Sequence, residues 1–112
     1  MKIQELVSDD EAAKALTFLR DTDEEAARCK AFLDATSENK KIIEAQEFFG
    51  SDEKSAEARK QAARISKAYK GWVVDFENAT ADYLILKNKR DRAFITLELW
   101  RSVNSARNKG HV

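Results

Sequence analysis

The feature that most constrains the fold of this 112-residue chain is a series of apolar side chains at alternating steps of four and three residues. The series runs through the second half of the chain at Ala58, Ala62, Ile65, Tyr69, Trp72, Phe76, Ala79, Tyr83, Leu86, Arg90, Ala93, Leu97, Trp100, Asn104 and Arg107. Twelve of these fifteen positions, which we call the heptad seam, are apolar or aromatic. This spacing keeps one face of an α-helix apolar, whereas a strand needs alternation with a period of two. The seam therefore predicts one long helix.

The rest of the chain is also predicted to be helical. It contains no proline, and its many Ala, Glu, Lys and Leu residues favour helix. Ser8 with Glu11, and Thr22 with Glu25, match the capping box, in which a hydroxyl and a carboxylate satisfy free backbone N–H groups at the start of a helix. These signals predict one helix start after Ser8 and a second after Thr22.

The boundary between the second and third predicted helices is marked by glycine. Gly50 can close a helix in the left-handed conformation, and Ser51 can cap the next helix. Asp52 and Glu53 would then face the positive end of that helix. The predicted helices comprise residues 9–20, 23–49 and 52–108.

Helix lengths predict an all-α, elongated antiparallel hairpin that forms a single domain over residues 1–112. A helix of about 55 residues spans about 80 Å, and a partner of about 27 residues covers only about half of it. The remainder of the long helix would expose apolar side chains, so we expect a homo-oligomer. The expected oligomerisation residues are Tyr83, Leu86, Phe94, Leu97, Trp100 and Val103. The polar seam residues Arg90 and Asn104 would set register or oligomer number.

Composition excludes several classes of protein. No apolar run approaches the ~18 residues of a membrane helix, and residues 1–10 lack the apolar core of a signal peptide. A single cysteine cannot form an internal disulfide and suits the reducing cytosol, so we expect a cytoplasmic protein. A structural zinc site usually needs four ligands, and the Cys and His residues are limited to Cys29 and His111. No metal or other cofactor is expected.

No set of residues has the spacing of a catalytic site. His111 lies in the tail after Gly110, where no fixed geometry is expected. Cys29 falls at apolar helical spacing and has no histidine to activate it, so we interpret it as a small core residue. Glu44 and Glu47 lack the Glu-x-x-His motif of a carboxylate metal site. We therefore expect a non-enzymatic protein.

The zero net charge hides a difference between the two halves of the chain. Residues 1–57 contain 15 acidic and 8 basic side chains, whereas residues 58–112 contain 5 acidic and 12 basic ones. This asymmetry indicates either an anionic partner or an acidic helix lying against a basic one. The two interpretations are equally consistent with the sequence.

The basic residues of the second half form the candidate nucleic-acid-binding set. Its members are Arg59, Lys60, Arg64, Lys67, Lys70, Lys87, Lys89, Arg90 and Arg92. Tyr69 and Trp72 are interleaved with Lys67 and Lys70, and single-strand-binding proteins combine a positive track with aromatic surfaces on which bases stack. Tyr69 and Trp72 also fall on the heptad seam, which favours a core role for them. A track of charge alone would bind phosphates independently of sequence and with strong salt dependence.

Two segments resemble a known family. Residues 88–102 contain a basic stretch, Phe94, an apolar run and the ending Glu98-Leu99-Trp100-Arg101. This segment resembles the C-terminal helix of UvsY-type phage recombination mediators. Residues 39–50, which are rich in Lys and Glu and close on Phe-Phe-Gly, resemble the part of that family that precedes the next helix. The chain departs from the family in its smaller length and in its strongly acidic N-terminal half.

The resemblance implies an oligomeric accessory protein that binds single-stranded DNA and helps a recombinase to displace the single-strand-binding protein. It implies the cytoplasm of a phage-infected or lysogenic bacterial host. By position, it makes Lys89, Arg90 and Arg92 basic residues of the C-terminal helix, and Leu97 and Trp100 part of its assembly surface. The alternative is a structural or adaptor protein without nucleic-acid binding, in which the seam mediates self-assembly or binds a partner helix.

Overall fold

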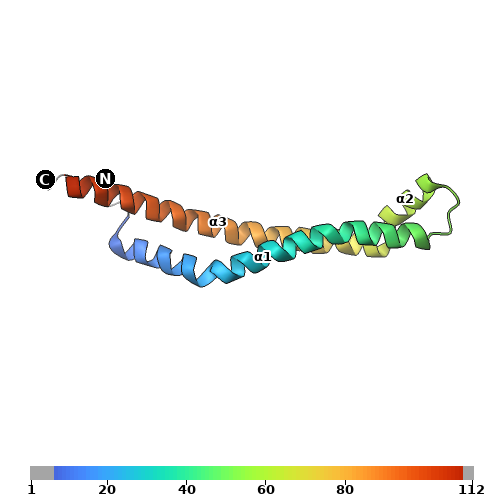
Figure 1. Cartoon of the computed structure of the whole chain (residues 1–112), viewed down its shortest axis with the longest axis horizontal. Helices are drawn as coiled ribbons and strands as arrows, with labels where there is room; N and C mark the ends of the chain where they lie inside the picture. The colour runs from blue at the N-terminus through green and yellow to red at the C-terminus, as the bar shows by residue number, and fades with distance from the viewer. Residues whose placement is uncertain (1–6, 110–112) are drawn as a thin grey trace. The chain divides into compact units, whose positions relative to one another are not determined.

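The structure is a computed structural model that describes residues 7–109, and it is all-α as predicted. Its helices are α1 (Asp9–Gly50), α2 (Ala56–Ile65) and α3 (Lys67–Lys109), and no strand occurs among the described residues (Figure 1). Within that range, no helix combines the length and the apolar character that a membrane span requires. His111 lies outside the described residues.

Helix α1 begins where the sequence predicts but does not break near residue 22. Ser8 Oγ accepts a hydrogen bond from the backbone N–H of Glu11 at 3.1 Å, which caps the start of α1. The predicted boundary between residues 20 and 23 is wrong, because α1 is continuous over 42 residues. The Thr22 hydroxyl donates to the carbonyl oxygen of Phe18 at 2.7 Å, a bond typical of a threonine inside a helix.

The turn after α1 differs from its predicted geometry. Helix α1 ends at Gly50, one residue beyond the predicted end at residue 49, and Gly50 does not adopt a positive φ. Ser51 Oγ accepts from the N–H of Glu53 within the turn, at 3.1 Å, and does not begin a helix. The N-cap of α2 is Ser55, whose Oγ accepts from the N–H of Ala58 at 3.0 Å. The predicted start at residue 52 is therefore wrong.

Ser66 divides the long helix that was predicted over residues 52–108. Its backbone is extended, at φ −64° and ψ 154°. The Ser66 hydroxyl donates to the Ala63 carbonyl at 2.8 Å and accepts from the N–H of Tyr69 at 3.1 Å. One side chain thus closes α2 and caps α3. Helix α3 then runs for 43 residues and continues through Gly71.

The chain forms two compact units. Among the described residues, unit 1 contains residues 7–26 and 85–109, and unit 2 contains residues 27–84. The single domain expected over residues 1–112 stays a prediction. The heptad seam faces α1, because every seam position from Tyr69 to Asn104 is buried or half-buried.

In unit 1, α1 and α3 run antiparallel around an aliphatic core. The buried residues are Val7, Ala12, Ala15, Leu19, Leu86, Ala93 and Val103. Phe18 and Leu97 pack against the cluster formed by Ala15, Leu19 and Ala93. At one end of this unit, Trp100 Nε1 donates to Asp9 Oδ1 at 2.8 Å. The expectation that this part of α3 lacks a partner within the chain is wrong, because α1 is longer than predicted and covers it.

In unit 2, the side chains between α1 and α3 are mainly aromatic residues of α3, whereas those of unit 1 are mainly aliphatic. Trp72 stacks on Phe76 with ring centroids 5.1 Å apart, and Tyr69 lies 5.6 Å from Trp72. The indole N–H of Trp72 donates to the backbone carbonyl of Thr36 on α1 at 2.6 Å. These aromatic side chains are half-buried, and the buried residues of this unit are small: Thr36, Ala63 and Ala79.

Candidate nucleic-acid interface

Five basic residues of the candidate set lie on α2 and the first turns of α3, all in unit 2. They are Arg59, Lys60, Arg64, Lys67 and Lys70. All except Arg59 are exposed, and no acidic residue occurs between positions 58 and 74. Lys60 and Arg64 are four residues apart on α2 and therefore share one face of that helix.

The lysines of α1 are neutralised locally by carboxylates. Lys14 pairs with Asp10 at 3.1 Å, and Lys30 pairs with Asp34 at 3.0 Å. The hydrogen bond from Lys30 to Asp34, together with the charge of that carboxylate, raises the pKa of Lys30. By contrast, four side chains of unit 2 form no ion pair with any described residue: Lys60, Arg64, Lys67 and Lys70.

Arg59 has an internal role. Its Nε donates to the backbone carbonyl of Glu53 at 2.7 Å, and its guanidinium carbon lies 5.7 Å from the centre of the Phe48 ring. This cation–π contact joins the start of α2 to the end of α1. Arg59 therefore holds the turn between these helices and leaves the exposed charge to Lys60 and Arg64.

The other four candidate basic residues lie on α3 in unit 1. Lys87 Nζ forms an ion pair with Asp91 at 2.7 Å, one helical turn away. Lys89 and Arg92 are exposed. Because Arg90 is half-buried on the seam, the structure does not bring these four side chains onto one exposed surface.

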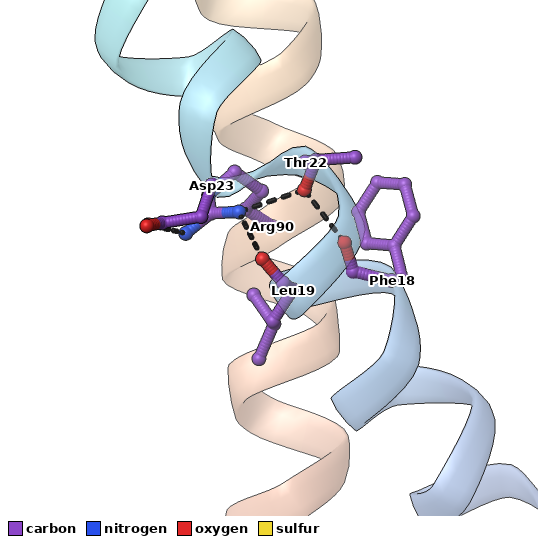
Figure 2. A network of polar contacts seen from close by, with 5 residues as sticks. All are labelled: Phe18, Leu19, Thr22, Asp23 and Arg90. Carbon is purple, nitrogen blue, oxygen red and sulfur yellow. Dashed lines mark hydrogen bonds and ion pairs between the residues drawn. The ribbon is translucent and has the colours of Figure 1, made fainter.

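Arg90 is hydrogen-bonded to α1 (Figure 2). Its Nη1 donates to the Leu19 carbonyl at 2.8 Å and to Thr22 Oγ1 at 2.7 Å, while its Nη2 lies 3.4 Å from Asp23 Oδ1. The Arg90 side chain is only 15% exposed. The guanidinium therefore joins α3 to α1 within one chain, and we remove it from the candidate phosphate-binding residues.

The seam aromatics are also engaged within the chain. Lys40 Nζ lies 5.8 Å from the centre of the Trp72 ring, and Lys30 Nζ lies 5.6 Å from that of Tyr83. Together with the Trp72 hydrogen bond to Thr36, these contacts support the core interpretation of the seam over base stacking. They leave the seam aromatics as internal packing groups.

The sequence did not mark Phe48, which lies beside α2, or its neighbour Phe49 as candidate binding residues. Phe49 is 78% exposed, and its ring meets that of Phe48 edge-on with centroids 5.4 Å apart. Phe48 is half-buried. Their position directly before the helix-closing Gly50 was visible in the sequence, but no periodicity linked them to the basic residues of α2. The fold of the turn makes that connection.

A pocket of about 380 Å³ lies between the end of α1 and α2. Helix α1 contributes Lys41, Glu44, Ala45 and Phe48, and helix α2 contributes Lys60, Ala63 and Arg64. Three of these seven residues are basic and one is acidic. The pocket thus combines cations with an apolar wall, and this lining suits an anion that also has an apolar part.

The residues expected to mediate oligomerisation occupy three environments. Leu86 and Val103 are buried within the chain, while Tyr83, Leu97 and Trp100 are half-buried. Phe94 is 52% exposed. Additional exposed apolar residues of α3 in unit 1 are Ile85, Ile95 and Leu99. Any surface for assembly in this part of α3 therefore lies outside the seam.

The described residues contain no cluster of His, Cys, Asp and Glu that could hold a metal ion. Cys29 is half-buried on α1. Comparisons of the chain with protein families, with curated proteins and with solved structures find no match.

Proposed function

We propose that this protein is a non-enzymatic accessory protein that binds single-stranded DNA through the exposed basic residues of unit 2. The observation that carries the proposal is a set of four exposed cations within eleven residues, none of which pairs with a described carboxylate: Lys60, Arg64, Lys67 and Lys70. Unpaired cations at this density attract a polyanion and release its counterions on binding.

The pattern of ion pairs weakens the competing explanation of the charge asymmetry. If the acidic half neutralised the basic half, the basic residues of α2 and α3 would pair with acids of α1. Arg90 does pair with Asp23 of α1, but that contact belongs to unit 1. In unit 2, the ion pairs of Lys30, Lys40 and Lys41 are local to α1. The positive charge of α2 is therefore left for a partner outside the chain.

A single strand is favoured over a duplex because aromatic groups adjoin the positive charge. Phe48 and Phe49 lie at the end of α1, and Phe48 lines the pocket beside α2. Unpaired bases can stack on such rings, whereas paired bases cannot. The further role, in loading a recombinase and displacing the single-strand-binding protein, rests on the resemblance of residues 88–102 to UvsY-type mediators.

The test is fluorescence anisotropy of a labelled oligo-dT strand, titrated with protein at several salt concentrations. We expect binding whose log–log salt slope is about −0.7 per phosphate contacted. The double variant Lys60→Glu/Arg64→Glu should weaken binding at low salt by at least about tenfold and flatten the slope. The double variant Lys14→Glu/Arg20→Glu changes the net charge by the same amount at two exposed residues of α1 in unit 1. It is the matched control and should bind like the parent protein.

The absence of binding at low salt would rule out the proposal. Equal losses for the two double variants would also contradict it, because they would show a response to net charge and not to a site. A duplex of the same length serves as competitor, and it should displace the oligo-dT strand poorly if bases contact the protein.

A second candidate function, self-assembly, is favoured by the exposed apolar residues of α3 in unit 1. Ile95 and Leu99 are 58% and 44% exposed, are four residues apart, and lie on the side of α3 opposite to the seam. We propose a second copy of this chain as their partner. Sedimentation equilibrium should show concentration-dependent association that Ile95→Glu abolishes. A monomer at all concentrations would eliminate this candidate.

A further inference from the structure

We infer that the pocket between α1 and α2 holds one nucleotide of the bound strand, with its phosphate on Lys60 and Arg64 and its base against Phe48. This inference rests on the proposed function and specifies where the strand makes contact beyond charge attraction. The pocket volume of about 380 Å³ falls in the range of small-molecule sites, which suits one nucleotide rather than an extended segment.

The charge of the pocket selects an anion. Lys60 and Arg64 line it from one face of α2 without a carboxylate partner. Lys41 lines it from α1, where its Nζ pairs with Glu38 at 3.2 Å. The acid of the lining, Glu44, has its carboxylate 4.0 Å from Lys40 Nζ, which offsets part of its charge. A guanidinium can donate two parallel hydrogen bonds to a phosphate, and a lysine adds a point charge.

The apolar wall distinguishes a nucleotide from a bare phosphate. Ala45, Phe48 and Ala63 line the pocket beside the cations. The Phe48 ring is held by the Phe49 ring, at 5.4 Å between centroids, and by the guanidinium of Arg59, at 5.7 Å. A ring fixed by its neighbours loses little freedom when a base packs on it. A phosphate alone would make no use of this surface.

The first experiment compares an oligo-dT strand with an abasic strand of equal length, which has the same phosphates but no bases. The parent protein should bind oligo-dT at least about five-fold more tightly, the lower end of what one stacked base contributes. Phe48→Ala should remove this preference while retaining binding to the abasic strand. Lys60→Ala/Arg64→Ala should weaken binding to both strands.

Controls distinguish the loss of a binding contact from unfolding of the variant. Circular dichroism must show parental helicity for each variant, and Phe48→Leu provides an apolar side chain without a ring should Phe48→Ala unfold. Phe48→Leu should also lower the preference for bases. If the parent protein binds both strands equally and tightly, the pocket inference is overturned while the proposed DNA binding stands.

The second experiment observes the alanine methyl groups by NMR. A base in the pocket should shift the methyl signals of Ala45 and Ala63 through its ring current, while Ala93, in the core of unit 1, should not respond. The abasic strand should shift these two signals much less than oligo-dT does. Unchanged Ala45 and Ala63 signals at saturating oligo-dT would refute the pocket site, whatever the affinity.

A third titration with thymidine monophosphate distinguishes the two sources of a nucleotide. We expect weak shifts of the same two methyl signals, because a strand adds phosphate contacts that the monomer lacks. Tight binding of the monomer without affinity for oligo-dT would overturn both the strand as the ligand and the proposed function, and would make the pocket a site for a free nucleotide.

Discussion

The two units share a hydrogen-bonded threonine motif on α1, but different side chains of α3 bond to it. In unit 1, the Thr22 hydroxyl donates to the Phe18 carbonyl at 2.7 Å, and in unit 2 the Thr36 hydroxyl donates to the Phe32 carbonyl at 2.8 Å. Both threonines follow a Phe-Leu-x-x sequence, and the two copies are fourteen residues apart, which is two heptads. The repeat therefore places both copies on the same face of α1.

The donor from α3 is what differs. Unit 1 uses the charged guanidinium of Arg90, which bonds to a carbonyl and to the Thr22 hydroxyl, whereas unit 2 uses the neutral indole of Trp72, which bonds to the Thr36 carbonyl. Around the charged donor the core is aliphatic and buried, and around the indole it is aromatic and half-exposed. The core of unit 1 thus excludes water better than the core of unit 2 does.

The largest expected effect compares the leucines of the two copies. Leu19 is buried in unit 1, whereas its counterpart Leu33 in unit 2 is half-buried. Leu19→Ala should lower the free energy of unfolding by about 3 kcal/mol, through lost burial and the cavity left behind. Leu33→Ala should cost clearly less. Urea unfolding followed by circular dichroism measures both, and equal losses would show that the units are packed equally well.

The next prediction compares the two cross-helix donors. Arg90→Met keeps the length of the side chain and removes hydrogen bonds from a charged group, so it should cost about 2 kcal/mol. Trp72→Phe removes one neutral hydrogen bond and part of the ring, and it should cost about 1 kcal/mol. The same urea experiment ranks them. A larger loss for Trp72→Phe would reverse the assignment of the stronger connection to unit 1.

The sequence predicts the seam well because periodicity reports directly on which face of a helix is buried. It misplaces the boundaries, because they depend on which of two hydrogen bonds a short polar side chain makes. Thr22 has the spacing of a cap but bonds back to Phe18, whereas Ser66 has no such signature and yet caps two helices. Because α1 is continuous, it also packs against the C-terminal part of α3, for which the sequence predicted no partner within the chain.

The candidate site was predictable in its charge but not in its geometry. The acid-free stretch that contains Lys60 and Arg64 is visible in the sequence, and the structure shows both side chains exposed. Arg90 belongs to the same candidate set although it falls on the heptad seam, and its contacts to α1 show that its role is internal. Phe48 and Lys41 joined the site because the turn after Gly50 returns α2 to the end of α1.

A smaller effect should be confined to unit 2. Ser66→Ala removes the side-chain bonds to Ala63 and Tyr69 and places a strong helix former at the break, so it should cost about 1 kcal/mol. Hydrogen exchange should accelerate for amides of α2 and the start of α3. Amides near Leu19 in unit 1 should exchange as before. Faster exchange in both units would show that they do not open separately.

The smallest effect compares two exposed lysines, one in each unit. Lys14 pairs with Asp10 alone, whereas Lys30 pairs with Asp34 and also lies over the ring of Tyr83. If the contact between the Lys30 amine and the Tyr83 ring stabilises the aromatic core of unit 2, Lys30→Met should lower the midpoint of thermal unfolding slightly more than Lys14→Met does. Equal midpoints for the two variants would show that the lysine adds nothing to that core.

The pH dependence of the Lys30 effect has a definite sign. Its pKa is raised above the ordinary value of 10.5, chiefly by the hydrogen bond to Asp34 and the charge of that carboxylate. A group whose pKa is higher in the folded than in the unfolded protein stabilises the fold below the unfolded value, and that stabilisation disappears as the pH rises through the folded value. The difference between the parent protein and Lys30→Met should therefore be constant from pH 7 to 9 and should vanish above the raised pKa. A difference that persisted there would trace the effect to the aliphatic stem of Lys30, which packs whether or not the amine is charged.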